Sequence, residues 1–179
     1  MFEAFRERMG RRALEAAVLA RTPSPLAARL RDRSLLIVLP ASEEGLRVAW
    51  PFVDGVDVPR SQLSCLVASD RVAYAPDRFA GSVQRVDAAD LDWRGLPRAA
   101  AAARLRGSAD VAINLAEPGT LVAEYLVGTS PAAVRIGRHS AGAEAYYDLM
   151  LAGTGPVSDL VGSLRHTLDH LVPPLLPLR

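Results

Sequence analysis

Five polar residues in two separate segments are the best candidates for a binding or catalytic site: Ser42, Glu43, Asn114, Glu117 and Thr120. The first two follow one apolar run of the chain, and the other three lie at the end of a second run or just after it. Two carboxylates such as Glu43 and Glu117 can act as general acid and general base if they face each other. Acids in the first turn of a helix also stabilise the helix dipole, and these positions favour that structural role. The pattern predicts a ligand site and assigns no catalytic residue.

The segment after the first apolar run, residues 40–44, reads Pro-Ala-Ser-Glu-Glu. A nucleotide phosphate is typically held by a glycine-rich loop whose amides close on the anion at a helix N-terminus. This segment contains no glycine, and its two carboxylates would repel a phosphate. We therefore expect neither a dinucleotide nor another cofactor here.

Four arginines, Arg6, Arg8, Arg11 and Arg12, make the start of the chain basic, because residues 1–33 carry eight arginines against four acids. Helical spacing predicts an amphipathic helix over residues 2–21. Its apolar stripe consists of Phe2, Phe5, Met9, Ala13, Ala16 and Ala20. This helix either docks on its own domain through the stripe or offers a basic face to an anionic partner such as RNA or a membrane surface. Docking is favoured, since the stripe would otherwise lie in water.

Two histidines, a cysteine and a short basic run could also do chemistry. His166 and His170 have a spacing that could suit a metal, but no third ligand is recognisable and we predict no metal site. Cys65 lies in an apolar run and is predicted to be a buried, unreactive thiol. Arg135 and the basic residues at 138–139 are interpreted as a solvated loop, with an anion site as the alternative.

Six short segments, the first of them continuously apolar, predict the strands that must position these residues: 35–39, 63–67, 82–86, 111–115, 134–136 and an edge strand at 147–151. Helical segments alternate with them, which favours a three-layer α/β/α Rossmann-like domain with a mainly parallel sheet of five to six strands in the order 3-2-1-4-5. In such a sheet ligands bind beyond the carboxyl ends of the strands where the order reverses. The predicted crevice therefore lies between strands one and four.

The length of 179 residues, half of them hydrophobic, indicates one domain with a substantial core. Residues 33–172 form the predicted domain, preceded by a helical arm at 1–32 and followed by a Pro-rich tail at 173–179. No window has the 18 or more apolar residues of a membrane span, and one cysteine cannot form an internal disulfide. A cytoplasmic location is expected.

The order of these elements from Leu35 to Leu171, together with Asp92-Trp93-Arg94-Gly95-Leu96-Pro97 and Tyr146-Tyr147-Asp148-Leu149-Met150, resembles an uncharacterised bacterial family of Rossmann-like domains. Within that resemblance, Trp93 is expected to be buried against the sheet, and Tyr146 and Tyr147 to lie in the edge strand. The segments 110–115 and 134–137 are distantly similar to the N-terminal half of heptosyltransferase-type (GT-B) glycosyltransferases. Those enzymes resemble two such domains that clasp an activated sugar donor, held mostly by the C-terminal domain, and this chain is too short to contain both.

The function expected from the sequence is a non-catalytic α/β binding or adaptor module that takes a protein partner, a second copy of itself or a small ligand. The alternative is a partner-dependent glycosyltransferase-like enzyme, or a binder of a sugar nucleotide or metabolite. Both versions of that alternative place the ligand in the crevice between strands one and four.

Overall fold

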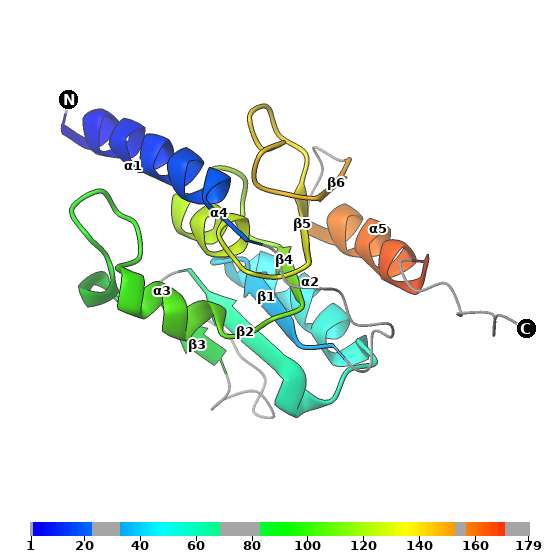
Figure 1. Ribbon diagram of the computed structural model, residues 1–179. Coiled ribbons are helices and arrows are strands. Elements are labelled where there is room, and N and C mark those ends of the chain that lie inside the picture. The colour runs from blue at the N-terminus through cyan, green and yellow to red at the C-terminus, as the bar shows by residue number, and fades with distance from the viewer. Residues whose placement is uncertain (1, 23–32, 69–82, 153–156, 171–179) are drawn as a thin grey trace, which may run out of the picture.

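The computed structural model describes residues 2–22, 33–68, 83–152 and 157–170, and the predicted tail at 173–179 lies outside these ranges. Six parallel strands form a single sheet in the order β3-β2-β1-β4-β5-β6, which confirms the predicted fold and strand order (Figure 1). The strands are β1 (Leu35–Leu39), β2 (Leu63–Val67), β3 (Val83–Arg85), β4 (Val111–Asn114), β5 (Val134–Arg138) and β6 (Leu149–Leu151).

Helices cover both faces of the sheet, and the alternation of side chains along β1 explains why. Leu36 and Val38 point into one apolar core with α3 (Ala99–Arg106) and α4 (Leu121–Gly128). Leu35, Ile37 and Leu39 point into the other, with α2 (Glu43–Gly55) and α5 (Val157–His170). All five residues of β1 are buried, as expected of a central strand covered on both faces. Two short 3-10 helices complete the described elements, η2 (Arg60–Gln62) and η4 (Ala88–Asp90).

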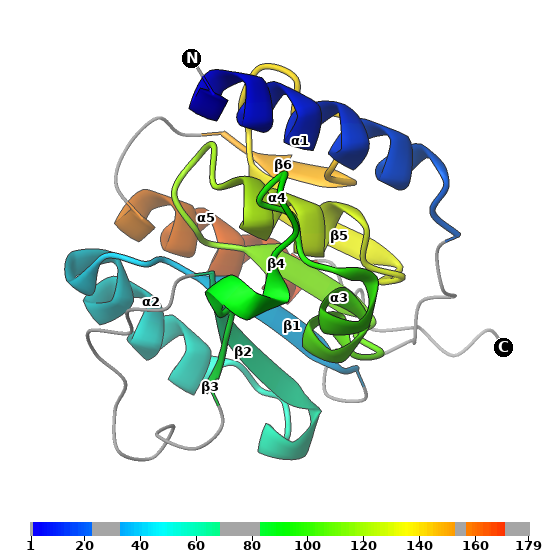
Figure 2. The ribbon, with the colours of Figure 1, turned by 90° about the vertical axis from the view of Figure 1, so that its left-hand side faces the viewer.

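The first helix, α1 (Phe2–Leu19), packs on the outer side of α4 (Figure 2). Its buried residues are Gly10, Leu14 and Val18, so the predicted stripe that included Phe2 and Phe5 is not the docking face. Gly10 helps to explain why this face of α1 packs on the domain. A Cβ at this position would lie 2.6 Å from Leu121 Cδ2 and 3.0 Å from the Arg94 carbonyl oxygen. A glycine lets α1 approach α4 and the loop at Arg94 this closely without displacing the Leu121 side chain.

Two expectations drawn from the family resemblance are wrong. Trp93 is not buried against the sheet but is 58 % exposed. The loop that carries it is fixed instead by Asp92, whose Oδ1 accepts the backbone N–H groups of Arg94 at 2.8 Å and Leu96 at 3.1 Å.

Tyr146 and Tyr147 precede the edge strand rather than lying in it, since β6 begins at Leu149, and both are buried. The Tyr147 ring covers Gly137 of β5, where a Cβ would lie 2.5 Å from Tyr147 Cζ. The missing side chain of Gly137 thus makes the space that the ring fills.

Candidate functional site

The crevice between β1 and β4 is occupied in part by a carboxylate of the protein itself. Glu117 accepts hydrogen bonds from the backbone N–H groups of Ala41 at 3.2 Å and Ser42 at 3.3 Å, and from Ser42 Oγ at 2.9 Å. Burial opposes its ionisation, but a hydrogen bond from its own backbone N–H and these three together outweigh burial and lower the pKa of Glu117. Thr120 Oγ1 donates to the Glu117 carbonyl oxygen at 2.8 Å. The position that would hold an anion beside α2 is therefore taken by Glu117.

The other two residues of the predicted crevice site have partners elsewhere. Glu43 accepts a hydrogen bond from Arg47 at 2.7 Å, one turn along α2, and both side chains are largely exposed. Asn114 is buried, donates from Nδ2 to the Tyr147 hydroxyl at 2.7 Å and accepts the Ala116 N–H at 2.9 Å. The structure thus brings Ser42, Glu117 and Thr120 together, bonds Asn114 to Tyr147 and Ala116 instead, and leaves Glu43 outside.

A hollow of about 200 Å³ remains beside this cluster. It is lined by Ser42, Glu44, Gly45, Val48, Glu117 and Val157. Among the described residues its lining has two carboxylates and no basic side chain, which makes it a poor match for a phosphate group.

The four predicted arginines of the arm do not act as one basic surface. Arg11 turns inward, where it forms an ion pair with Glu124 and donates to the Gly119 carbonyl oxygen at 3.1 Å. Arg6 lies beside Gly95, and Arg8 and Arg12 are exposed.

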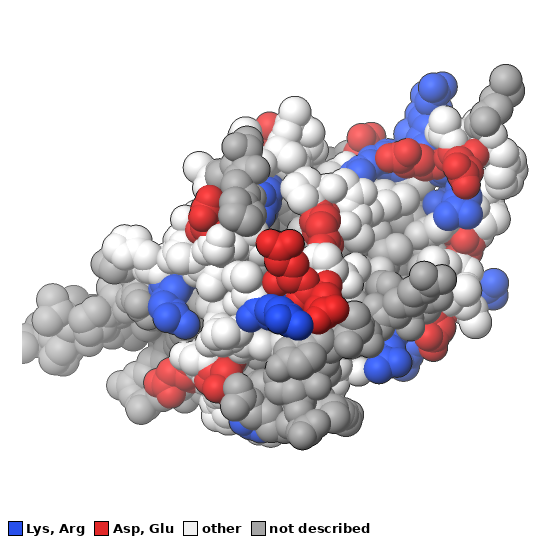
Figure 3. All heavy atoms as spheres, turned by 180° about the vertical axis from the view of Figure 1, so that it is seen from behind, with Lys and Arg blue, Asp and Glu red and all other residues white. Residues whose placement is uncertain are grey.

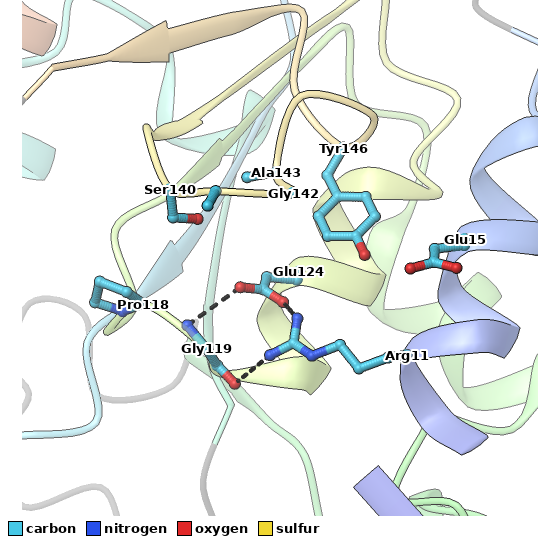
Figure 4. Close-up of a pocket in the computed structure, with 10 residues that line it drawn as sticks. Arg11, Glu15, Pro118, Gly119, Glu124, Ser140, Gly142, Ala143 and Tyr146 are labelled. Carbon is cyan, nitrogen blue, oxygen red and sulfur yellow. Dashed lines mark hydrogen bonds and ion pairs between the residues drawn. The ribbon is translucent and has the colours of Figure 1, made fainter. Parts of the chain in front are cut away.

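A larger pocket of about 430 Å³ opens where α1, α4 and the loop between β5 and β6 meet (Figure 4). It lies near the carboxyl ends of β4 and β5, the edge of a parallel sheet where ligands bind. Its volume falls within the range of small-molecule sites, about 300 to 1,000 Å³. The lining residues are Arg11, Glu15, Pro118, Gly119, Glu124, Ser140, Ala141, Gly142, Ala143 and Tyr146.

Two tight turns shape this pocket, and each depends on a glycine. In residues 117–120 the Thr120 N–H donates to the Glu117 carbonyl at 3.2 Å, and Gly119 has φ +86°. In residues 140–143 the Ala143 N–H donates to the Ser140 carbonyl at 3.0 Å, and Gly142 has φ +84°. A positive φ at the third residue defines the type II turn, and the Pro118-Gly119 pair is its usual sequence.

One ion pair joins α1 to the wall of the pocket. The side chain of Glu124 is 7 % exposed and accepts hydrogen bonds from Arg11 and from the Gly119 N–H, the latter at 3.1 Å. Figure 4 shows these bonds, with the Tyr146 hydroxyl pointing to the side where Arg11 and Glu15 project from α1. Charged groups that satisfy each other in this way form a fixed wall of the pocket.

The Tyr146 hydroxyl is held in its protonated form. Burial raises its pKa, and the negative charge of Glu15 raises it further, while Arg11 acts in the opposite sense. A protonated hydroxyl can donate a hydrogen bond to a ligand as well as accept one. Of the charged residues in the lining, Glu15 and Glu124 are negative and Arg11 is positive, so the pocket carries one net negative charge.

Sequence reasoning did not find this pocket, although it contained one usable signal. Glu124 is the only charged residue in α4, whose other residues are mostly apolar. Because α4 is mostly apolar, it is expected to be buried, and a buried carboxylate requires a cationic partner. Arg11 is the partner of Glu124. Glu15, Ser140 and Tyr146 carried no comparable signal, because only the tertiary fold places them together.

The other candidates from the sequence are Arg135, Cys65 and the histidines of α5. The interpretation of Arg135 as part of a solvated loop is wrong, because it lies in β5, is buried and pairs with Asp148 at 2.8 Å. Cys65 is buried as predicted, and burial raises the pKa of its thiol to about 12. His166 is exposed, and the described residues hold no cluster of three metal-ligating side chains.

The surface and the helices place two further constraints on function. On the face opposite to that of Figure 1, acidic and basic side chains are interspersed, and the described residues there form no broad basic field (Figure 3). Within the described part of the chain, every helix is too short or too polar to cross a bilayer.

Comparisons of the chain with protein-family models, with curated proteins and with solved structures gave no match.

Proposed function

We propose that this protein is a non-catalytic binding module, and that its ligand is a small polar molecule, neutral or positively charged, held in the pocket between α1, α4 and the β5–β6 loop. The observation that carries the proposal is the composition of that pocket. It combines a ligand-sized volume of about 430 Å³ with two carboxylates against one guanidinium. An anion entering it would meet net negative charge, whereas an amine or a polyol would meet acceptors.

The proposed ligand would be recognised by groups that the fold already holds in place. Glu15 supplies an exposed carboxylate acceptor, Tyr146 a hydroxyl donor and Ser140 a second hydroxyl at the rim. Pro118 and Ala143 give the pocket apolar walls. A few polar groups set among apolar walls are typical of small-molecule sites.

We propose no catalytic role because the two strongest candidates for a catalytic group, Glu117 and Asn114, are hydrogen-bonded within the protein. Glu117 accepts three hydrogen bonds from residues 41–42, and both polar groups of Asn114 are bonded within the protein. A general base must be free to reach the proton that it removes, and these groups hold the fold together instead.

The glycosyltransferase-like alternative places a sugar nucleotide in the crevice between β1 and β4. The hollow of about 200 Å³ at the reversal point of the sheet supports a ligand there. Glu117 weighs against a nucleotide, because its carboxylate already accepts the N–H groups that a phosphate would use. We therefore place this alternative second.

Thermal unfolding in the presence of test ligands separates the two sites. Spermidine and glucose represent the cationic and neutral ligands of the proposed pocket, and UDP-glucose represents the crevice alternative. A ligand that binds only the folded state at about 100 times its Kd stabilises the protein by about 2.7 kcal/mol, so a real site gives a clear rise in Tm.

Substitutions that leave the fold intact then locate the binding. Glu15→Gln should abolish a shift caused by spermidine and preserve one caused by glucose, and Ser140→Ala should weaken both. Glu144→Gln is the matched control, because Glu144 is an exposed carboxylate of the same loop that does not line the pocket. A shift by UDP-glucose that survives Glu15→Gln and disappears in Ser42→Ala would instead favour the crevice. No shift with any of the three probes at millimolar concentration would contradict the pocket proposal.

A further inference from the structure

The large hydrophobic side chains that are exposed among the described residues gather around α1. They are Phe2 at 70 %, Phe5 at 53 %, Leu19 at 84 % and Trp93 at 58 %. The first three belong to α1, and Trp93 lies on the loop that packs against it, next to Arg94 and its contact with Gly10. Figure 2 shows α1 along the margin of the molecule, with its outer side away from the other described elements.

The same side of α1 carries two exposed arginines, Arg8 and Arg12. At about 100° per residue, Phe5, Arg8, Arg12 and Leu19 fall on the face opposite Gly10, Leu14 and Val18, and all four are exposed. Glu3 and Glu7 share the side of Gly10 and Leu14. Glu15 borders the outer face, about 20° from Arg8 on the helical wheel, and it also lines the pocket. The outer face of α1, defined here as Phe2, Phe5, Arg8, Arg12 and Leu19, is therefore both apolar and basic.

We propose that the outer face of α1 binds the surface of a lipid bilayer that contains anionic headgroups. A helix that lies in the membrane interface buries its aromatic and aliphatic side chains at the boundary of the acyl chains and keeps its arginines at the headgroups. Long arginine side chains suit this arrangement because their stems are apolar and their charged ends reach outward. The Arg11–Glu124 pair and the Gly10 contact hold the inner face on the domain, so the outer face is presented without unfolding α1.

The arrangement of charge favours a lipid surface over a second copy of the chain or an RNA. A symmetric dimer through this face would bring the same charges of two copies together, and with two arginines against one bordering acid, Glu15, both sides of that contact would be net positive. RNA affinity rests on many phosphate contacts, and two arginines supply few, whereas the exposed apolar area has no partner on a phosphate backbone.

Sedimentation of the full chain with lipid vesicles tests the proposal. The protein should bind vesicles of phosphatidylcholine mixed with phosphatidylserine, and should bind vesicles of phosphatidylcholine alone much less. Phe5→Ser with Leu19→Ser should abolish binding. Arg8→Gln with Arg12→Gln should weaken it about 25-fold, because each arginine near an anionic surface contributes about a fivefold gain in affinity.

The matched control removes two exposed arginines from other parts of the molecule, Arg47 of α2 and Arg85 of β3. Arg47→Gln with Arg85→Gln lowers the net charge equally and should leave binding unchanged. All variants should keep the wild-type Tm, since the substituted residues are exposed.

Three results would overturn the proposal. The wild-type protein could fail to bind anionic vesicles, or the control pair could weaken binding as much as the α1 pair. Alternatively, binding to poly(U) RNA, or a concentration-dependent dimer lost in the Phe5→Ser and Leu19→Ser variant, could occur without vesicle binding.

Discussion

Replacement of Asp148 by asparagine removes the negative charge that lies between two largely buried arginines. Asp148 accepts three hydrogen bonds from Arg135, at 2.9 Å from the backbone N–H, 2.9 Å from Nε and 2.8 Å from Nη2. Arg21 Nη2 lies 3.8 Å away on the other side. The side chains of Arg135 and Arg21 are 7 % and 10 % exposed, and although both also donate to main-chain carbonyl oxygens, Asp148 supplies the negative charge beside them.

The size of the effect follows from this geometry. Removing one partner of a buried ion pair costs about 3–5 kcal/mol. The Asp148 side chain is 36 % exposed, so water compensates in part, and we expect the free energy of unfolding to fall by about 2–3 kcal/mol at neutral pH.

The same change has a pH signature. Burial opposes the ionisation of Asp148, but the hydrogen bonds and charge of Arg135 outweigh burial and lower its pKa. A lowered pKa in the folded state means that Asp148 stabilises the protein above its unfolded pKa, and that this contribution is lost as the pH falls through the folded pKa. The difference between wild type and Asp148→Asn should therefore shrink below about pH 4.

Urea unfolding measured at neutral pH and at about pH 3 checks both statements. Glu144→Gln is the control, because Glu144 is an exposed carboxylate in the same loop, and it should change stability by less than about 0.5 kcal/mol. A loss below about 1 kcal/mol for Asp148→Asn at neutral pH would refute the reasoning, and so would an equal loss at both pH values.

Three further predictions concern single positions, namely Gly137 of β5, Gly162 of α5 and Cys65 of β2. Gly137→Ala should destabilise the protein by about 1–3 kcal/mol, because its Cβ would meet the Tyr147 ring at 2.5 Å. Gly162→Ala in α5, where nothing lies within 4 Å, should instead stabilise it by about 0.5–1 kcal/mol, and thermal unfolding compares the two. Cys65 should react with a thiol reagent only as the protein unfolds, since it is buried and the pKa of its thiol is about 12; rapid labelling of native protein would contradict this.

The central sheet could be predicted from the sequence because its signal is local. The run that becomes β1 is continuously apolar, as a strand covered on both faces must be, and β2 and β4 are mostly apolar. Alternation of strands with helical segments then leaves few topologies, and the short segment at Leu149–Leu151 extends the predicted order to a sixth, edge position.

The face of α1 that packs on the domain could not be predicted in the same way. The spacing of apolar residues favoured a stripe through Phe2 and Phe5, but the buried face is the one with Gly10. The buried face is decided by the close approach of Gly10 to Leu121 of α4 and by the ion pair of Arg11 with Glu124. Leu121 and Glu124 both lie more than 100 residues further along the chain.

The crevice and the pocket show what the sequence determined and what only the tertiary structure decided. Order along the chain was enough to place Ser42 and Glu117 at the same edge of the sheet, because parallel strands end together there. It did not reveal that Glu117 bonds to residues 41–42, nor that Glu15, Ser140 and Tyr146 surround one pocket. Those relations depend on side-chain directions set by packing between distant segments, whereas strands and helices follow from patterns within a few residues.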